Sequence, residues 1–255
     1  MSLVDTYLAG LRQSLVAEDL DQLKHAHGAS AADLQRLSKR YPLCPASLLQ
    51  LLGQIDGTHY RDYPNGEVMV LMLGSDLPGY PYYLSSVEDI LAEADGLDTE
   101  SIVELYEGWF ENGWLDQEMD LIGEGIDPTV GMNERLCFSH CINNGGTSRL
   151  YIDFNPAPGG TVGQVMRFLH DPDNYEVIAP SFDHYLQQLI DDDYAFIRPE
   201  PKSRLTATEM SGGSLAATEP KARRNALRLA CTDHRSCALP GTRATPDKPA
   251  THCQY

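Results

Sequence analysis

LYIDFNPAPGGTVGQV at positions 150–165, followed by YEVIAPSFDHYLQQL at positions 175–189, is the stretch that decides the fold. Apolar residues occupy every second position from 150 to 154, which is the period of a strand buried on one face only. Pro156 has no amide hydrogen to donate to a neighbouring strand, so we expect this strand to end before it.

The rest of the stretch predicts two more strands and a helix. The Pro/Gly-rich residues 157–160 indicate a reversal of the chain, and a second strand resumes at about Gly163. The sequence DPDN at 171–174 is a turn signal, so residues 175–179 are expected to form a third strand. Ser181 is a good N-cap for an amphipathic helix. The stretch therefore predicts an antiparallel meander closed by a helix that lies on the sheet.

Helical patterns come before this meander. Apolar stripes and capping residues predict helices that begin near Tyr7, Ser30, Pro45, Ser86 and Ser101. The apolar run at 68–73 predicts a buried strand, and residues 136–139 predict another. Because helices come first and strands dominate later, we expect an α+β fold, with N-terminal helices packed on a mostly antiparallel mixed sheet and a closing C-terminal helix.

Several short motifs follow one another along the chain. They are Tyr41-Pro42, Leu48-Leu49 and Ile55-Asp56-Gly57, then Ile152-Asp153-Phe154-Asn155-Pro156, Gly163-Gln164-Val165, and Ile178-Ala179-Pro180-Ser181-Phe182. In this order they resemble the SUKH superfamily, which includes the Smi/Knr-type domain of fungal cell-wall synthesis regulators and many bacterial immunity proteins. The resemblance covers roughly positions 31–192. It implies that these signature residues are structural, with Asn155 shaping its loop by side-chain-to-backbone bonding.

The charge of the chain is strongly asymmetric. Residues 1–200 contain 10 Lys/Arg and 33 Asp/Glu, whereas residues 201–255 contain nine basic and four acidic residues. Between Asp62 and Glu134 there are 18 acidic residues and no Lys or Arg. Such a surface repels nucleic acid and anionic lipid and attracts basic proteins. The alternative is a solvated acidic surface that only maintains solubility.

Composition also predicts the domain organisation. Residues 1–198 are expected to form the α+β domain, and residues 199–255, rich in Ser, Thr, Ala, Pro, Lys and Arg, a disordered low-complexity basic tail. No window approaches the length of an apolar membrane span, and the first 20 residues lack an apolar signal core. We therefore expect a cytoplasmic protein whose six cysteines are reduced.

Candidate chemistry is sparse. Cys137, His140 and Cys141 could supply metal ligands, but no second pair follows at a suitable spacing, so both cysteines are expected to be core residues. A second Cys/His cluster occurs in the tail. Asp153 and Asn155 share one face of the expected strand, yet the local pattern provides no basic partner for them. The sequence predicts no enzyme activity, no metal and no cofactor.

The region around the two tryptophans has an interface-like composition. Aromatic residues surrounded by carboxylates are typical of a surface that binds a basic protein. The alternative is that both tryptophans belong to the core. The predicted partner-binding residues are Glu104, Glu107, Trp109, Glu111, Trp114, Asp116, Glu118 and Asp120.

The resemblance and the charge together predict a non-enzymatic bacterial immunity protein. It would bind and neutralise a cognate toxin, a basic one of the nuclease type, through the acidic region 88–127. The alternative is a regulatory or scaffolding module that binds host proteins, as the resemblance to the fungal members of the superfamily suggests. We expect no nucleic-acid partner and no membrane partner.

Overall fold

The computed structural model describes residues 1–77, 80–96, 99–111, 121–143, 146–170 and 172–197, without the side chains at 108–111, 142–143 and 146. These residues fall within one compact unit, Met1–Gly213, whereas the second unit, Ser214–Tyr255, lies outside the described residues. The predicted tail at 199–255 therefore also lies outside them.

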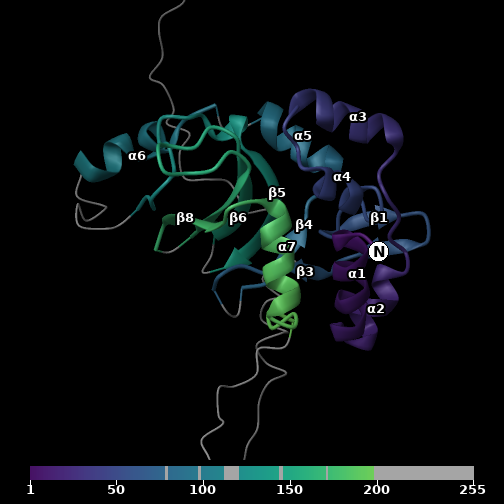
Figure 1. Ribbon diagram of the computed structural model, residues 1–255. Coiled ribbons are helices and arrows are strands. Elements are labelled where there is room, and N and C mark those ends of the chain that lie inside the picture. The colour runs from purple at the N-terminus through teal and green to yellow at the C-terminus, as the bar shows by residue number, and fades with distance from the viewer. Residues whose placement is uncertain (78–79, 97–98, 112–120, 144–145, 171, 198–255) are drawn as a thin grey trace, which may run out of the picture. The chain divides into compact units, whose positions relative to one another are not determined.

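The described residues form an α+β fold, as predicted (Figure 1). The α-helices are α1 (Leu3–Ser14), α2 (Ala17–Leu23), α3 (Ala31–Arg40), α4 (Ala46–Leu52), α5 (Val87–Gly96), α6 (Ile102–Glu111) and α7 (Phe182–Asp191). A short 3₁₀ helix, η1, spans Met132–Glu134. The strands are β1 (Arg61–Tyr63), β2 (Gly66–Val68), β3 (Leu71–Leu73), β4 (Tyr82–Leu84), β5 (Leu136–Asn143), β6 (Gly146–Asp153), β7 (Gln164–Leu169) and β8 (Asn174–Ala179).

One six-stranded sheet organises the unit. Its strand order is β3-β4-β5-β6-β7-β8, and each neighbouring pair is antiparallel. The predicted meander is β6-β7-β8, with Leu150 opposite Arg167 and Val165 opposite Ala179. A parallel bridge between Ile122 and Tyr175 adds a short contact at the β8 edge. The meander prediction is confirmed.

Both faces of the sheet are covered, so the prediction of a half-buried strand at 150–154 is wrong. Leu150 and Ile152 belong to a large core shared with α1, α4 and α7. Tyr151 belongs instead to a second core on the other face, together with Met166 and residues from α6 and the segment 121–132. Alternation placed the side chains on opposite faces correctly, but long-range packing decides whether each face meets solvent or protein.

The apolar run at 68–73 does not form one strand. Val68 ends β2, which pairs with β1, whereas Leu71 begins β3, which pairs with β4 in the large sheet. Between them, the amide of Val70 donates to the carbonyl of Thr58 at 3.0 Å. The run is split because its two ends find different pairing partners, and apolar composition alone does not reveal this.

Helix α7 closes the fold on the large core. The Ser181 hydroxyl accepts a hydrogen bond from the amide of His184 and caps α7, as predicted. Buried tyrosines then join α7 and its C-terminal turn to distant elements: the Tyr185 hydroxyl donates to the carbonyl of Gly74 at 2.6 Å, and the Tyr194 hydroxyl donates to the carbonyl of Tyr7 at 2.9 Å. The second of these bonds holds the end of the described chain against the N-terminal helix α1.

Candidate interaction surface

Helix α5 carries a strongly acidic outer face. Its apolar residues, among them Ile90 and Leu91, are buried in the large core. Ser86 and Asp89 form a reciprocal cap at its start: the Asp89 amide donates to the Ser86 hydroxyl at 3.1 Å, and the Ser86 amide donates to the Asp89 carboxylate at 3.2 Å. The exposed residues of the helix are Glu88, Asp89, Ala92, Asp95 and Gly96.

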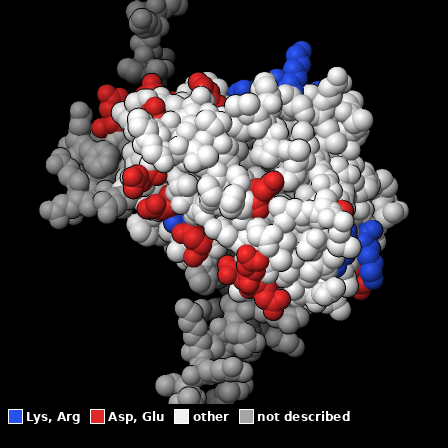
Figure 2. All heavy atoms as spheres, in the orientation of Figure 1, with Lys and Arg blue, Asp and Glu red and all other residues white. Residues whose placement is uncertain are grey.

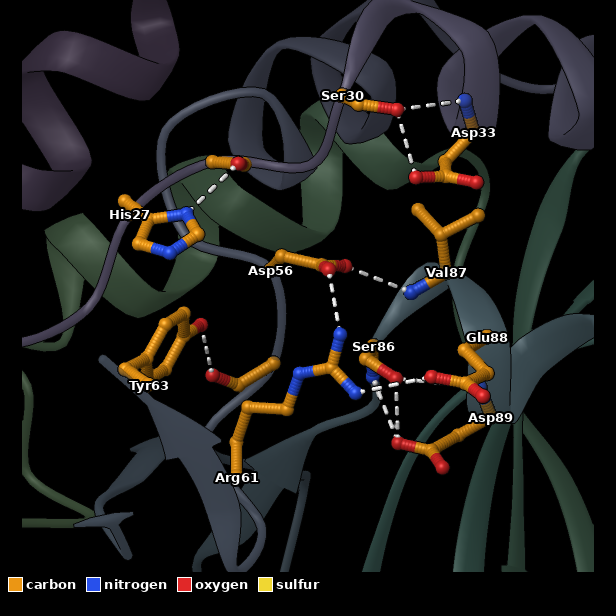
Figure 3. Close-up of polar contacts among 12 residues, drawn as sticks. His27, Ser30, Asp33, Asp56, Arg61, Tyr63, Ser86, Val87, Glu88 and Asp89 are labelled. Carbon is orange, nitrogen blue, oxygen red and sulfur yellow. Dashed lines mark hydrogen bonds and ion pairs between the residues drawn. The ribbon is translucent and has the colours of Figure 1, made fainter. Parts of the chain in front are cut away.

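A network around Arg61 flanks the start of α5 (Figure 3). Its guanidinium donates to Asp56 at 3.0 Å and to Glu88 at 3.2 Å. Asp56 also accepts from the amide of Val87 at 2.8 Å, so one buried carboxylate joins the β1 arginine to the N-terminus of α5. Arg61 lies near three carboxylates, those of Asp56, Glu88 and Asp89.

An open groove of about 550 Å³ lies between α5 and the strands β5 and β6. Glu93 of α5 and Arg149 of β6 form an ion pair across it at 3.2 Å. The rings of His59 and His140 meet edge to face in its lining, with their centroids 4.2 Å apart. Asp89, Ala92 and Gly96 line the α5 side.

The environment of His140 keeps its imidazole neutral. Burial, reinforced by the nearby His59 and Arg149, lowers the pKa of His140 to about 3. Its Nδ1 atom lies 3.4 Å from the hydroxyl of Ser85. At neutral pH the groove therefore contains an uncharged ring at this position.

Only part of the predicted partner-binding set lies within the described residues. Glu104 and Glu107 are exposed on α6. Trp109 and Glu111 lie in the same helix, but their side chains are outside the described structure, as are the whole residues Trp114, Asp116, Glu118 and Asp120.

Glu104 has a structural role within α6. Its carboxylate accepts from both the amide and the hydroxyl of Ser101, each at 2.7 Å. These hydrogen bonds hold the pKa of Glu104 below its ordinary value. Glu107 lies on the same exposed side as Val103, whose side chain is 49% exposed. The described part of the exposed face of α6 therefore carries both an apolar side chain and a carboxylate.

The exposed basic residues of the described unit lie early in the chain. They are Arg12 of α1, Lys24 directly after α2, and Arg36 and Lys39 of α3. After Tyr41, the described residues contain four arginines and no lysine, and each arginine is ion-paired with a carboxylate. The pairs are Arg61 with Asp56 and Glu88, Arg135 with Asp153, Arg149 with Glu93, and Arg167 with Asp76. Figure 2 shows the carboxylates gathered along the left and lower parts of the view, with blue atoms mainly on the side of the N-terminal helices.

The family of the chain follows from its sequence match. The model of the SMI1 / KNR4 family (SUKH-1) matches residues 28–188, which is more than half of the chain. The chain belongs to the SMI1 / KNR4 family (SUKH-1). This family includes immunity proteins and fungal regulators. No curated protein sequence matches the chain.

In this SUKH-1 protein, several signature residues meet in a buried polar network. Asp153 lies 3.6 Å from the guanidinium of Arg135, and both side chains are fully buried. Gln164 donates to Asp153 at 3.1 Å and to the carbonyl of Gly125 at 2.8 Å. The network ties the segment before β5 to the ends of β6 and β7, so its arrangement fits a structural role.

The role predicted for Asn155 is wrong in its detail. The side chain that bonds to the backbone of this loop is that of Asp153 and not that of Asn155. Its carboxylate accepts a hydrogen bond from the backbone amide of Asn155 at 3.1 Å. The exposed Asn155 side chain donates instead to Glu134 at 3.2 Å. Asp153 can accept this bond because it is the last residue of β6 and its carboxylate is buried. The amide of Asn155 follows two residues later, which is the spacing of a side-chain-to-backbone turn.

The other signature residues also occupy structural positions. Gly163 has a φ of +86°, and its amide donates to the carbonyl of Asp153 at 2.8 Å. Pro156 follows β6, and Gln164 begins β7. Val165, Ala179 and Phe182 are buried in the large core of this SUKH-1 domain.

Gly57 explains the Asp-Gly motif of the SUKH-1 domain. Its φ is +89°, and a Cβ atom there would lie 2.8 Å from the backbone nitrogen of Ser86. A side chain would therefore separate the loop from the start of α5 and disturb the bond between Asp56 and Val87.

The cysteines of the SUKH-1 domain behave as small core residues. Cys141 is buried in the large core, and Cys137 is buried in the second core. Among the described residues, no group of three or more His, Cys, Asp or Glu side chains is placed to hold a metal ion. The tail cluster of Cys231, His234 and Cys237 lies outside the described residues. No helix in the described part of the chain is long and apolar enough to cross a membrane.

The groove and the Arg61 network were not anticipated from sequence. His59 and His140 are far apart in the chain, and so are Glu93 and Arg149. The sequence did contain one signal, since four isolated arginines in an otherwise acidic stretch invite ion pairing. It did not identify their partners.

Proposed function

We propose that this protein is a non-enzymatic bacterial immunity protein, which binds a cognate basic toxin of the nuclease type and neutralises it stoichiometrically. It would act in the cytoplasm of the cell that makes it. Membership of the SUKH-1 family supports this class of function.

The uneven distribution of charge along the chain carries the proposal. Beyond Tyr41, every Arg of the described residues is ion-paired with a carboxylate, so this part of the chain contributes many exposed carboxylates and no exposed Lys or Arg. A nuclease needs a basic surface to hold phosphate groups, and an acidic inhibitor offers that surface a similar field. Such complementarity can raise association rates to about 10⁸ M⁻¹s⁻¹ at low salt.

The outer faces of α5 and α6 are the proposed interface. Glu88, Asp89 and Asp95 are exposed on α5, and Glu107 is exposed on α6. Tight binding would require an interface of about 1,600 Å² in total. The predicted anchors Trp109 and Trp114 would then add apolar contacts at this surface.

The proposal assigns binding to residues 1–198 and treats residues 199–255 as a separate basic tail. The tail contains nine basic and five acidic residues. Its sign is opposite to that of the domain, so it would not add to the attraction for a basic toxin.

The test is an affinity purification of the tagged full-length chain from its native cells. We expect one basic toxin domain, retained at a one-to-one ratio and released at high salt because exposed charges are screened there. The purified toxin should then lose its activity in proportion to added protein and reach full inhibition at one equivalent.

Two results would count against this function. Recovery of several housekeeping proteins would favour a regulatory or scaffolding module instead. A toxin that binds but remains active at saturation would show that binding does not neutralise it.

A further inference from the structure

We propose that the groove between α5 and β5–β6 receives an arginine side chain of the partner. This inference deepens the proposed function, because it names the site and the chemical group that would be bound there. The groups involved are Asp89 and Glu93 from α5, His140 from β5, Arg149 from β6, and His59.

The groove has room for a guest side chain. Its volume is about 550 Å³, and it is open to solvent. The α5 side is lined by small residues, Ala92 and Gly96, next to the two carboxylates. A Cβ atom added to Gly96 would meet nothing within 4 Å, which confirms the open space at this end of the helix.

The charge of the groove favours a cation. Asp89 and Glu93 lie one helical turn apart, so their carboxylates share a face of α5. Arg149 neutralises Glu93 through their ion pair at 3.2 Å. Both hydrogen bonds from Ser86 fall on the Oδ2 atom of Asp89, and no hydrogen bond within the described residues uses its Oδ1 atom. Asp95, exposed near the end of the same helix, adds further negative charge to α5.

The imidazoles favour arginine over lysine. His140 stays uncharged at neutral pH because burial and its neighbours lower its pKa to about 3. A neutral ring does not repel a cation and offers a flat surface on which a guanidinium can stack. The guanidinium also carries several donors in one plane, so it can bond to the Oδ1 atom of Asp89 while it lies against the ring.

A titration with a small probe tests the site without a toxin. The ¹⁵N-labelled full-length chain is titrated with Nα-acetyl-arginine amide at constant ionic strength, and amide chemical shifts are recorded. Nα-acetyl-lysine amide and the neutral Nα-acetyl-citrulline amide serve as comparisons. We expect saturable shifts in α5, β5 and β6, binding about fivefold weaker for the lysine probe, and none for citrulline.

Two kinds of variant establish where the probe binds. Ala92→Phe fills the groove without changing its charge, and Val103→Phe is the matched control on exposed α6. Glu93→Gln leaves Arg149 uncompensated in the groove. Its charge-matched control is Glu67→Gln, at an exposed glutamate of β2 outside the proposed interface. We expect Ala92→Phe and Glu93→Gln each to weaken binding about tenfold, with Val103→Phe and Glu67→Gln unchanged. Gly96→Leu provides a second steric block if the thermal transition of Ala92→Phe shows a disturbed fold.

The inference fails if the arginine probe produces only non-saturating shifts spread over the acidic surfaces. It also fails if the groove-filling variants bind the probe as the wild type does. Either result would leave the proposed function standing, because a toxin could still bind elsewhere on the acidic surface. Conversely, saturable probe binding in a protein that inhibits no toxin would support the groove and contradict the function.

Discussion

Asp153 shows how one side chain can serve several neighbours at once. Its buried carboxylate lies 3.6 Å from Arg135 and accepts hydrogen bonds from Gln164 and from the amide of Asn155, both at 3.1 Å. Arg135 in turn donates to the carbonyls of Val130 and Asp127, at 2.8 and 2.6 Å. The arrangement compensates two buried charges, and removing one of them should therefore be costly.

Asp153→Ala is expected to lower the free energy of unfolding by about 3–5 kcal/mol, because it leaves the buried Arg135 without its carboxylate. Chemical denaturation of the two proteins measures the difference. Asp95→Ala is the control on the exposed face of α5, where about 0.5 kcal/mol or less is expected. Equal effects for the two substitutions would contradict a structural role for Asp153.

His140 makes the stability of the fold sensitive to acid. Its pKa is about 3 in the folded state, below the ordinary value of 6.5. The unfolded chain therefore binds a proton at this residue as the pH falls below 6.5, whereas the folded chain does not. The corresponding stability is complete above that pH and is lost progressively as the pH falls toward 3.

His140→Asn should reduce this acid sensitivity. Between pH 7.5 and pH 5, the wild type is expected to lose about 2 kcal/mol more stability than the variant, as followed by denaturation at each pH. Carboxylates elsewhere titrate equally in both proteins, so the difference isolates His140. His184→Gln, at an exposed position on α7, is the control and should follow the wild type. If the stability of His140→Asn fell with pH as steeply as that of the wild type, His140 would take up a proton in the folded protein within this pH range.

At the scale of elements, α7 is stabilised at its ends by different means. Its N-terminus is capped by Ser181, whereas its last turn carries no basic residue and is followed by Asp192 and Asp193. Negative charge at a helix C-terminus is unfavourable by a few tenths of a kcal/mol or more. The buried bond from Tyr194 to Tyr7 holds this end in place instead.

Ser181→Ala removes the cap of α7 and should lower the stability of the domain by about 1 kcal/mol. Ser181→Asp should retain most of that stability, because a carboxylate can accept the same amide hydrogen bond from His184. Ser38→Ala is the matched control inside α3, where Ser38 bonds only to the carbonyl of Leu34. Thermal or chemical unfolding would compare the three variants, and an unchanged Ser181→Ala protein would show that tertiary packing alone positions α7.

At the scale of the whole molecule, the separation of charge should control how fast a partner is captured. The exposed basic residues lie early in the chain, and the carboxylates of α5 and α6 lie far along the chain from them. Reversing the charge of Glu88, Asp95 and Glu107 to Lys should slow association with a basic toxin about tenfold or more at low salt and flatten its salt dependence. Stopped-flow or surface-binding kinetics at several salt concentrations would measure both effects.

The matched control reverses three exposed carboxylates that precede α5 in the chain. They are Glu18, Asp21 and Glu67. It changes the net charge by the same amount, so it separates local steering from a general effect of charge. Equal slowing in both triple variants would contradict an interface on α5 and α6. Unchanged circular dichroism in both would show that the comparison concerns binding and not folding.

Much of the fold could be predicted because its signals are local. Ser30, Ser86 and Ser181 each cap a helix as expected, since a capping bond joins residues only three positions apart. The meander was likewise visible in the period and turns of one continuous stretch. The split at 68–73 was missed, because the choice of pairing partner depends on strands elsewhere in the chain.

The candidate site likewise has one feature that the sequence indicates and one that it does not. The acidic character of the region 88–127 is a property of composition, and Glu107 on α6 is exposed as an interface residue must be. The groove depends on the approach of α5 to β5 and β6, and no local pattern indicates it.

The sequence by itself determined the helices other than α2, the meander, the family motifs and the sign of the surface charge, because each depends on residue types or on spacings of a few residues. Only the tertiary structure decided that both faces of the sheet are covered, that Asp153 shares its burial with Arg135, and that His59 approaches His140. These features join residues that are distant in the chain. Their free energies come from desolvation and contact in the folded state, and those arise only when the elements meet.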